Sequence, residues 1–266
     1  MYRAQAGRAP LWIFCGAVIL FLVMPIVIIM ITSLNASAYM EFPPRQLSLR
    51  WYANFFGSPH WVEPTLLSLR IAVIVTICAT VLGTLAAIGI VRGRFRGRAA
   101  LEMFFVSPMV VPIVVLALGL FFQFSSAHLL DKPVALILGH TLIATPLVIV
   151  LLRAGLRSTN PSIELAARSL GANYWRTLWH VMLPSLRESI AAAAIFSFLI
   201  SFDEVVIAIF VGGPSATTLP KRMWETIRFE IDPTLTAISS LLTLVAILIL
   251  VSVELVRRSV QTADRT

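Results

Sequence analysis

Six long apolar stretches, separated by shorter polar segments, dominate the pattern of hydrophobic and polar positions along the chain. Each is close to the roughly 20 residues that a helix needs to cross about 30 Å of hydrocarbon. We therefore predict an all-α membrane protein with one transmembrane domain, residues 11–257, between short tails at residues 1–10 and 258–266. The six predicted spans are residues 11–33, 66–91, 100–124, 133–152, 189–211 and 235–256.

The composition agrees with this interpretation. Hydrophobic residues make up 58% of the chain and the mean hydropathy is +0.90, well above soluble domains, which are roughly half apolar. Ala36-Ser37-Ala38, behind the first stretch, resembles a signal-peptidase site. The stretch is longer than the roughly 7–15 apolar residues of a signal peptide, so we predict an uncleaved span. For residues 34–65, which are polar and aromatic, the sequence leaves open whether they are helical.

The arginine residues predict the orientation in the membrane. Six spans place both termini on the same side, and residues 92–98 contain four arginines in a short loop. If the termini are cytoplasmic, most of the 21 lysines and arginines lie inside, in the tails, in residues 92–98 and in residues 153–187. The positive-inside rule favours this orientation. It also makes the segment between the fourth and fifth spans cytoplasmic.

That segment, residues 158–187, is the longest polar helical pattern in the chain, and we call it the coupling loop. Asn160-Pro161 is typical of a helix N-cap followed by a first helical residue. Glu164 suits the positive end of the helix dipole, and Gly171 suits the positive φ of a C′ residue. A second short helix is expected from about Asn173. We therefore predict two short helices that project into the cytoplasm.

Glu164-Leu165-Ala166-Ala167, followed by Gly171 and by Leu183-Pro184, resembles the "EAA" loop in permease subunits of bacterial ATP-binding-cassette importers. Leu165 replaces the first alanine of the family pattern. The resemblance implies a type I importer permease fold in which this loop forms a coupling helix that docks onto an ATPase. The ATPase-coupling residues it implies are Glu164, Ala166, Ala167, Arg168 and Gly171. The alternative is an amphipathic helix that lies on the lipid surface.

Further motifs between residues 11 and 257 resemble the spermidine/putrescine permease branch of these importers. They are Ser48–Tyr52, Ser68-Leu69-Arg70, Arg92–Arg98, Ser201–Val205 and Thr218-Leu219-Pro220. The resemblance implies a multi-pass protein of the bacterial inner membrane, surrounded by lipid, that pairs with a second permease as a heterodimer. It also implies an ATPase dimer that holds the ATP and Mg, and an extracytoplasmic substrate-binding protein. We expect no cofactor in this chain and no nucleic-acid partner.

Two adjacent acidic residues, Asp203 and Glu204, lie inside the fifth apolar stretch. A charge at that depth costs several kcal/mol by insertion scales, so it requires a partner, which an organic cation would supply. Phe198 and Phe202 would add cation–π contacts, and Ser201 completes the predicted substrate-binding set. Successive helical residues point about 100° apart, so both acids cannot face one point. The sequence leaves open which acid contacts the solute, and whether both are instead structural.

These features favour a transport subunit of an ATP-driven importer, with a polyamine as the leading solute. Relatives that carry aminophosphonates or other small organic solutes share much of the Ser201–Val205 pattern, so another organic nitrogen compound is the alternative. The sequence has no Walker A motif, and we therefore expect ATP hydrolysis on a separate subunit. It also has no clustered histidines, nucleophile motif or metal-ligand spacing, which argues against a membrane enzyme. An ATP-independent channel or secondary transporter would need no ATPase dock.

Overall fold

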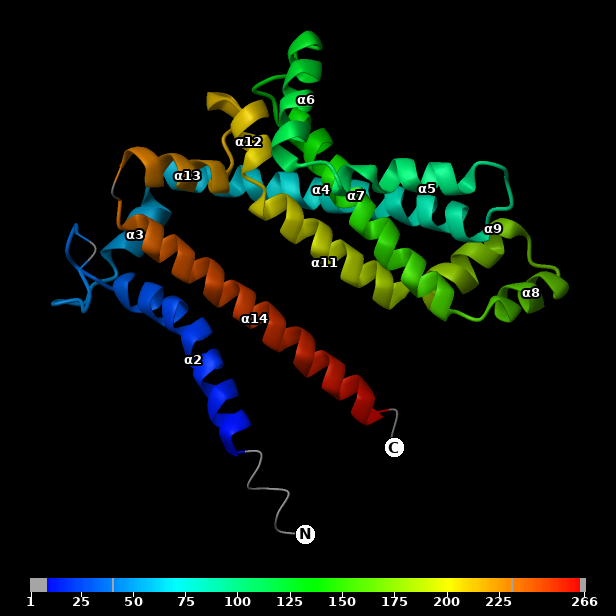
Figure 1. The fold of residues 1–266 in the computed structure, drawn as a ribbon, viewed down its shortest axis with the longest axis horizontal. Coiled ribbons are helices and arrows are strands. Elements are labelled where there is room, and N and C mark those ends of the chain that lie inside the picture. The colour runs from blue at the N-terminus through cyan, green and yellow to red at the C-terminus, as the bar shows by residue number, and fades with distance from the viewer. Residues whose placement is uncertain (1–8, 40, 231, 264–266) are drawn as a thin grey trace. The chain divides into compact units, whose positions relative to one another are not determined.

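The computed structural model describes residues 9–39, 41–230 and 232–263 (Figure 1). These residues form helices and connections, with one isolated β-bridge between Asn35 and Leu47, so the all-α prediction is confirmed. The chain divides into two compact units, residues 1–62 with 225–266 and residues 63–224. The outermost residues of the predicted tails, 1–8 and 264–266, lie outside the described residues.

Among the described residues, three helices are long and apolar enough to cross a membrane. They are α2 (Ala9–Thr32), α4 (Pro59–Arg92) and α7 (Pro133–Ser158). Two sharply bent helix pairs raise the number to as many as five among the described residues if each pair is one span. The last helix, α14 (Thr234–Ala263), contains the sixth predicted span, residues 235–256. The count of six spans therefore stays a prediction.

The first unit contains α2, α3 (Arg50–Gly57) and α14. Helix α3 lies in the region whose secondary structure the sequence left open. The buried ring of Trp51 donates from Nε1 to the carbonyl oxygen of Asn35 at 2.8 Å. Asn54 donates from Nδ2 to Thr234 Oγ1 at 2.8 Å. Side-chain hydrogen bonds thus fix α3 to the end of α2 and to the start of α14.

The second unit contains the predicted coupling and substrate residues. Beyond α4 and α7 it holds α5 (Arg98–Val106), η1 (Ser107–Met109), α6 (Ile113–Ser126), α8 (Pro161–Ser169), α9 (Tyr174–Thr177), η2 (Leu178–Met182), α10 (Leu183–Ser185), α11 (Arg187–Asp203), α12 (Val206–Val211), η3 (Pro214–Ala216) and the start of α13 (Leu219–Phe229). Helices α4, α5, α7 and α11 run along this unit, and α8 and α9 lie at one end of it (Figure 1). A Cβ on Gly83 of α4 would lie 2.5 Å from Val148 Cγ1 of α7, so the two helices approach closely where only a glycine fits.

The third and fifth predicted spans are both interrupted. The segments Arg98–Met109 and Ile113–Ser126 meet at 99°, so residues 100–124 do not form one straight helix. Pro112 precedes α6 with ψ 129° and has no N–H to continue a helical ladder, which accounts for this bend. In the fifth predicted span, residues 189–211, α11 ends at Asp203 and α12 begins at Val206. We call residues 204–205 the helix break.

Candidate functional site

The coupling loop has the local structure that its sequence predicts. Asn160 Oδ1 accepts a hydrogen bond from the backbone N–H of Ser162 at 2.9 Å, so Asn160 is the N-cap of α8. At the other end Gly171 has φ +89°, and the N–H of Ala172 donates to the carbonyl of Ala167 at 3.1 Å. That bond over five residues, with a left-handed glycine, is a Schellman ending. The coupling loop therefore turns sharply between α8 and α9.

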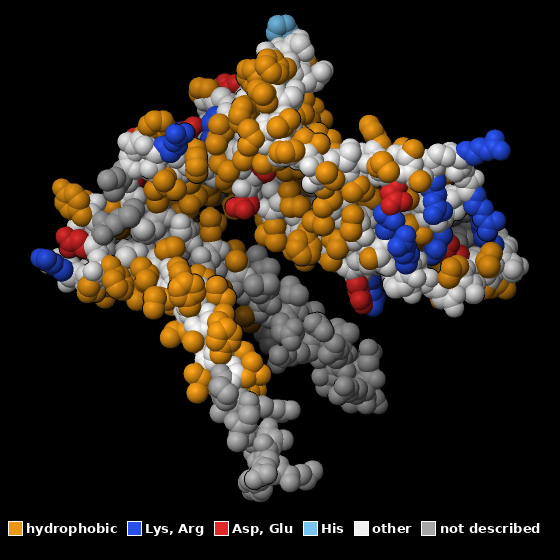
Figure 2. Space-filling view, in the orientation of Figure 1, with side chains coloured by type: hydrophobic (Ala, Val, Ile, Leu, Met, Phe, Trp, Pro, Cys, Tyr) orange, Lys and Arg blue, Asp and Glu red, His pale blue; other side chains and the backbone are white. Residues whose placement is uncertain are grey.

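The second short helix of the coupling loop also begins as predicted. Asn173 Oδ1 accepts a hydrogen bond from the N–H of Arg176 at 2.8 Å and caps α9. Large apolar side chains of the coupling loop remain uncovered by this chain: Ile163, Leu165, Leu170, Trp175 and Trp179 are 57% to 90% exposed. Arginine side chains gather at the same end of the unit (Figure 2). An apolar surface within a basic surround suits a protein partner.

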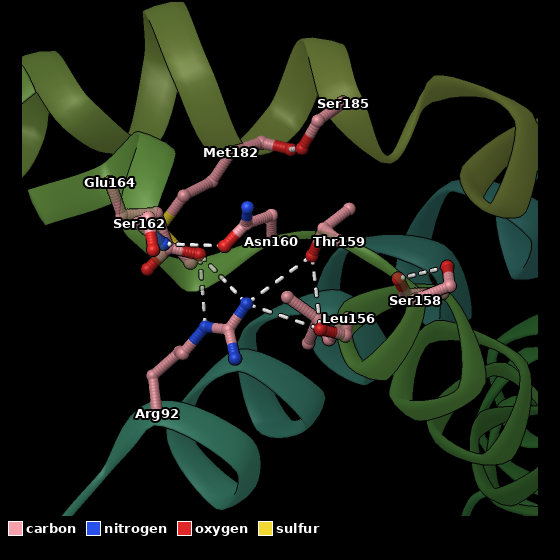
Figure 3. Close-up of polar contacts among 10 residues, drawn as sticks. Arg92, Leu156, Ser158, Thr159, Asn160, Ser162, Glu164, Met182 and Ser185 are labelled. Atoms are coloured by element: carbon pink, nitrogen blue, oxygen red, sulfur yellow. Dashed lines mark hydrogen bonds and ion pairs between the residues drawn. The ribbon is translucent and has the colours of Figure 1, made fainter. Parts of the chain in front are cut away.

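The side chain of Glu164 points toward Arg92 and binds its own chain (Figure 3). Its Oε1 accepts from Arg92 Nε at 2.9 Å and lies 2.8 Å from Arg92 Nη2. The same Nη2 donates to the carbonyl of Leu156 at 3.1 Å and to Thr159 Oγ1 at 3.2 Å. One guanidinium thus joins the end of α4 to the end of α7 and to the first turns of α8. We call this contact the Arg92–Glu164 pair.

The predicted coupling residues therefore differ in their environments. Ala166, Arg168 and Gly171 are exposed, Ala167 is half-buried, and Glu164 is engaged inside the unit. Arg92 was predicted only as a marker of topology, and its contact with Glu164 was not predicted. The available signal was a basic residue at the cytoplasmic end of a span, which does not identify a partner 72 residues away.

The helix break divides the predicted substrate residues in a similar way. Glu204 Oε1 accepts a hydrogen bond from the backbone N–H of Ile207 at 2.9 Å, so its carboxylate caps the start of α12. The N-cap residue Val205 makes no side-chain cap bond, so the Glu204 carboxylate supplies the capping acceptor for α12 where the fifth predicted span is interrupted. Asp203, the last residue of α11, is exposed. The two adjacent acids therefore have different environments.

The remaining three predicted substrate residues lie on α11. The rings of Phe198 and Phe202 stack with centroids 5.7 Å apart and planes 10° apart, and both side chains are half-buried. Ser201 is buried and shares a hydrogen bond with His140 Nδ1 of α7 at 3.0 Å. The structure therefore brings the two aromatic rings together and turns Ser201 into the protein.

The far end of α12 is also held by side chains. Asp131 Oδ1 accepts from the backbone N–H groups of Ser215 and Ala216 at 2.8 and 2.9 Å. The N–H of Asp131 donates to the carbonyl of Val211 at 3.1 Å. Lys221 Nζ donates to the carbonyl of Gly212 at 2.7 Å. Hydrogen bonds therefore anchor α12 at both ends, although it has fewer than two helical turns.

Residues 79–263 match the family described as "Binding-protein-dependent transport system inner membrane component". The chain belongs to this family. The permease is 33% identical over 229 residues to the putrescine transport system permease protein PotI of Escherichia coli K12, covering 84% of this chain and 81% of the relative. It is 26% identical over 245 residues to the spermidine/putrescine transport system permease protein PotC of the same strain, covering 92% of each. A diacetylchitobiose uptake system permease protein, NgcG of Streptomyces coelicolor, is 27% identical over 70% of this chain and 63% of the relative.

A solved structure has the same fold. It is a bacterial ABC transporter involved in the import of the acidic polysaccharide alginate, with a TM-score of 0.79, 16% identity and coverage of 96% of this chain and 98% of that one. A complex of such a transporter with an alginate-loaded periplasmic protein matches with a TM-score of 0.69 and 15% identity, over 94% and 95% of the two chains. The predicted importer-permease fold and the multi-pass location in the inner membrane are thereby confirmed. The permease is a transport subunit of an ABC importer.

Proposed function

We propose that the permease carries a small organic cation of the polyamine class, such as putrescine or spermidine, and that Asp203 is the residue that attracts it. The permeases PotI and PotC, whose names refer to putrescine and spermidine, support the solute class. The observation that carries the proposal is the position of Asp203, exposed at the end of an interrupted helix. Phe198 and Phe202, stacked in the preceding turn, offer aromatic surface to an ammonium group.

The electrostatics of the helix break favour a cation. The last carbonyls of a helix carry about half a negative charge, and α11 ends at Asp203. Interrupted membrane helices use such ends to coordinate cations. The carboxylate of Glu204 is bonded to the N-terminus of α12 and offsets its positive end, which would otherwise repel a cation. Asp203 and the end of α11 therefore act together, while Glu204 has a structural part.

The partners of the proposed importer are a second permease, an extracytoplasmic binding protein and an ATPase dimer that holds ATP and Mg. The exposed apolar side chains of the coupling loop, among them Leu165 and Trp175, support an ATPase dock. Ala166, Arg168 and Gly171 would lie in that dock, and Ala167 at its edge. ATPase closure would move the coupling loop, and the helices around the helix break would alternate between outward and inward access.

Uptake of labelled putrescine and spermidine by the complete importer tests this proposal. We expect Asp203→Asn to lower uptake about tenfold or more, since a hydrogen bond to a charged group contributes about 1.5–3 kcal/mol and about 1.4 kcal/mol is a factor of ten. Glu204→Gln should have a smaller effect, because the amide oxygen can still accept from Ile207. The matched control is Glu188→Gln, which removes an exposed carboxylate from the opposite end of α11 and should leave uptake unchanged.

Membrane insertion and assembly are measured in parallel for every variant. Normal uptake by an assembled Asp203→Asn importer would contradict the assignment of Asp203. If the native importer takes up neither polyamine, the solute is a different one, and an aminophosphonate or another organic nitrogen compound is tried next.

A further inference from the structure

Two neighbouring residues of α7 contact the chain on both sides of the helix break. His140 is fully buried, and its Nδ1 shares the 3.0 Å hydrogen bond with Ser201 in the last turn of α11. A Cβ on Gly139 would lie 2.9 Å from Cγ2 of Ile207, in the first turn of α12. The side chain at position 139 must therefore be absent for α12 to pack where it does. The segment Gly139-His140 thus fixes the end of one helix relative to the start of the next.

This contact is specific in its chemistry. Burial of a histidine among apolar helices costs free energy unless the ring is hydrogen-bonded, and among the described residues Nε2 has no hydrogen-bond partner. The bond to Ser201 is therefore the polar contact that holds the ring at this position. Other hydroxyls of α11 behave differently: Ser197, one turn earlier and equally buried, bonds to the backbone carbonyl of Ala193 in its own helix.

We propose that Gly139 and His140 are positioning residues for solute binding, which hold the helix break so that Asp203 faces the translocation path. The inference rests on the proposed function, because it assigns Asp203 the contact with the cation. Asp203 follows Ser201 by two residues, so a shift of the last turn of α11 displaces its carboxylate. Loss of the His140–Ser201 bond should therefore weaken solute binding more than it slows transport at saturation.

The first experiment needs no solute. Asp203→Cys is introduced into a chain that also carries Cys15→Ser and Cys78→Ala, and the assembled importer is labelled with a charged, membrane-impermeant thiol reagent. We expect His140→Leu and Ser201→Ala each to change the labelling rate about two- to tenfold, the range for losing one neutral hydrogen bond. Ser197→Ala removes the same hydroxyl from the same helix and should leave the rate unchanged.

A conservative variant separates positioning from mere packing. His140→Asn keeps a hydrogen-bonding group where Nδ1 lies. It should therefore give the same labelling rate as the Asp203→Cys importer with His140 in place, although it removes most of the ring. If His140→Leu does not assemble, the labelling rates of Ser201→Ala, His140→Asn and Ser197→Ala still test the positioning role. Equal labelling rates in the Asp203→Cys importer with no further change, with Ser201→Ala and with Ser197→Ala would overturn the proposal.

The second experiment measures polyamine uptake with Asp203 in place. Ser201→Ala should raise KM about three- to tenfold with the maximal rate near that of the native importer, and His140→Asn should keep the native KM. A lower maximal rate at unchanged KM would contradict positioning and indicate a gating defect. If labelling changes as expected but the native importer takes up no polyamine, the positioning role stands and the proposed solute fails.

Discussion

Replacing Arg92 with alanine should loosen the coupling loop from the rest of its unit. The guanidinium makes four polar contacts, two with the Glu164 carboxylate and one each with Leu156 and Thr159. Removal of Arg92 leaves Glu164 without its cation and breaks the contact between the end of α4 and the start of α8. We therefore expect α8 to open locally more often, while the transmembrane helices remain folded.

The magnitude follows from the burial of the Arg92–Glu164 pair. Unit charges about 4 Å apart attract by about 4 kcal/mol at an effective dielectric constant of about 20. The side chains of Arg92 and Glu164 keep 22% and 19% of their exposure, so water screens part of this attraction. Allowing for screening and for the desolvation of both groups, we expect the pair to stabilise the closed coupling loop by about 2–3 kcal/mol. Glu164→Gln should cost less, about 1–2 kcal/mol, because the amide oxygen still accepts from Arg92.

Hydrogen exchange of the amides in α8, measured by mass spectrometry on the permease in lipid nanodiscs, tests this magnitude. An opening free energy lower by about 2–3 kcal/mol speeds exchange roughly 30- to 150-fold. Arg168→Ala is the matched control, since it removes an exposed charge from the same helix. An exposed charge contributes up to about 1 kcal/mol, so this control should change exchange by at most about fivefold.

The double variant tests most directly whether Arg92 and Glu164 stabilise α8 as one pair. If Arg92 and Glu164 act as one pair, Arg92→Ala with Glu164→Gln should exchange no faster than Arg92→Ala alone. Additive effects of the two substitutions would show that each side chain stabilises α8 separately. Exchange in Arg92→Ala within about fivefold of native would mean that the pair contributes no more than an exposed charge.

Two further substitutions test the local structure of the coupling loop and of the segment after α12. Gly171→Ala should speed hydrogen exchange of the Ala172 amide about five- to thirtyfold, because an alanine at φ +89° costs about 1–2 kcal/mol. The control is Gly119→Ala, inside α6 with open space around it, which should leave that exchange unchanged. Asp131→Ala removes the acceptor of two backbone N–H groups and should speed protease cleavage of the loop after α12 about tenfold. Asp131→Asn keeps an acceptor oxygen and should speed cleavage less, so equal cleavage in both variants would contradict the anchoring role.

The parts of the structure that the sequence predicted are those governed by local rules. The N-cap at Asn160 and the left-handed turn at Gly171 depend on residues within one or two turns, so their residue types are sufficient signals. The apolar stretches predicted the long membrane helices for the same reason, since length and hydropathy are local properties. The contact between Arg92 and Glu164 joins residues far apart in the chain, and no local pattern selects that partner among the other arginines.

The helix break escaped prediction because the chain remains apolar on both sides of it. Hydropathy continues from α11 into α12, and Val205, the N-cap residue of α12, is not among the preferred N-cap residues, so no boundary signal was available. The sequence raised the possibility that one acid binds the solute and the other pairs with protein, but it could not assign them. The assignment depends on the bond from the Ile207 N–H to Glu204, a geometric detail of the folded chain.

Helix α7 contacts both the helix break and the Arg92–Glu164 pair. His140 contacts α11 at the helix break, and Leu156, on the same helix, accepts a hydrogen bond from Arg92 of the Arg92–Glu164 pair. Their separation of 16 residues along α7 corresponds to about 24 Å at a rise of about 1.5 Å per residue. Pro146 lies between the two contacts and removes one helical hydrogen bond, so bending of α7 costs least there. A load applied to α7 at Leu156 would therefore bend the helix more readily at Pro146 than elsewhere between the two contacts.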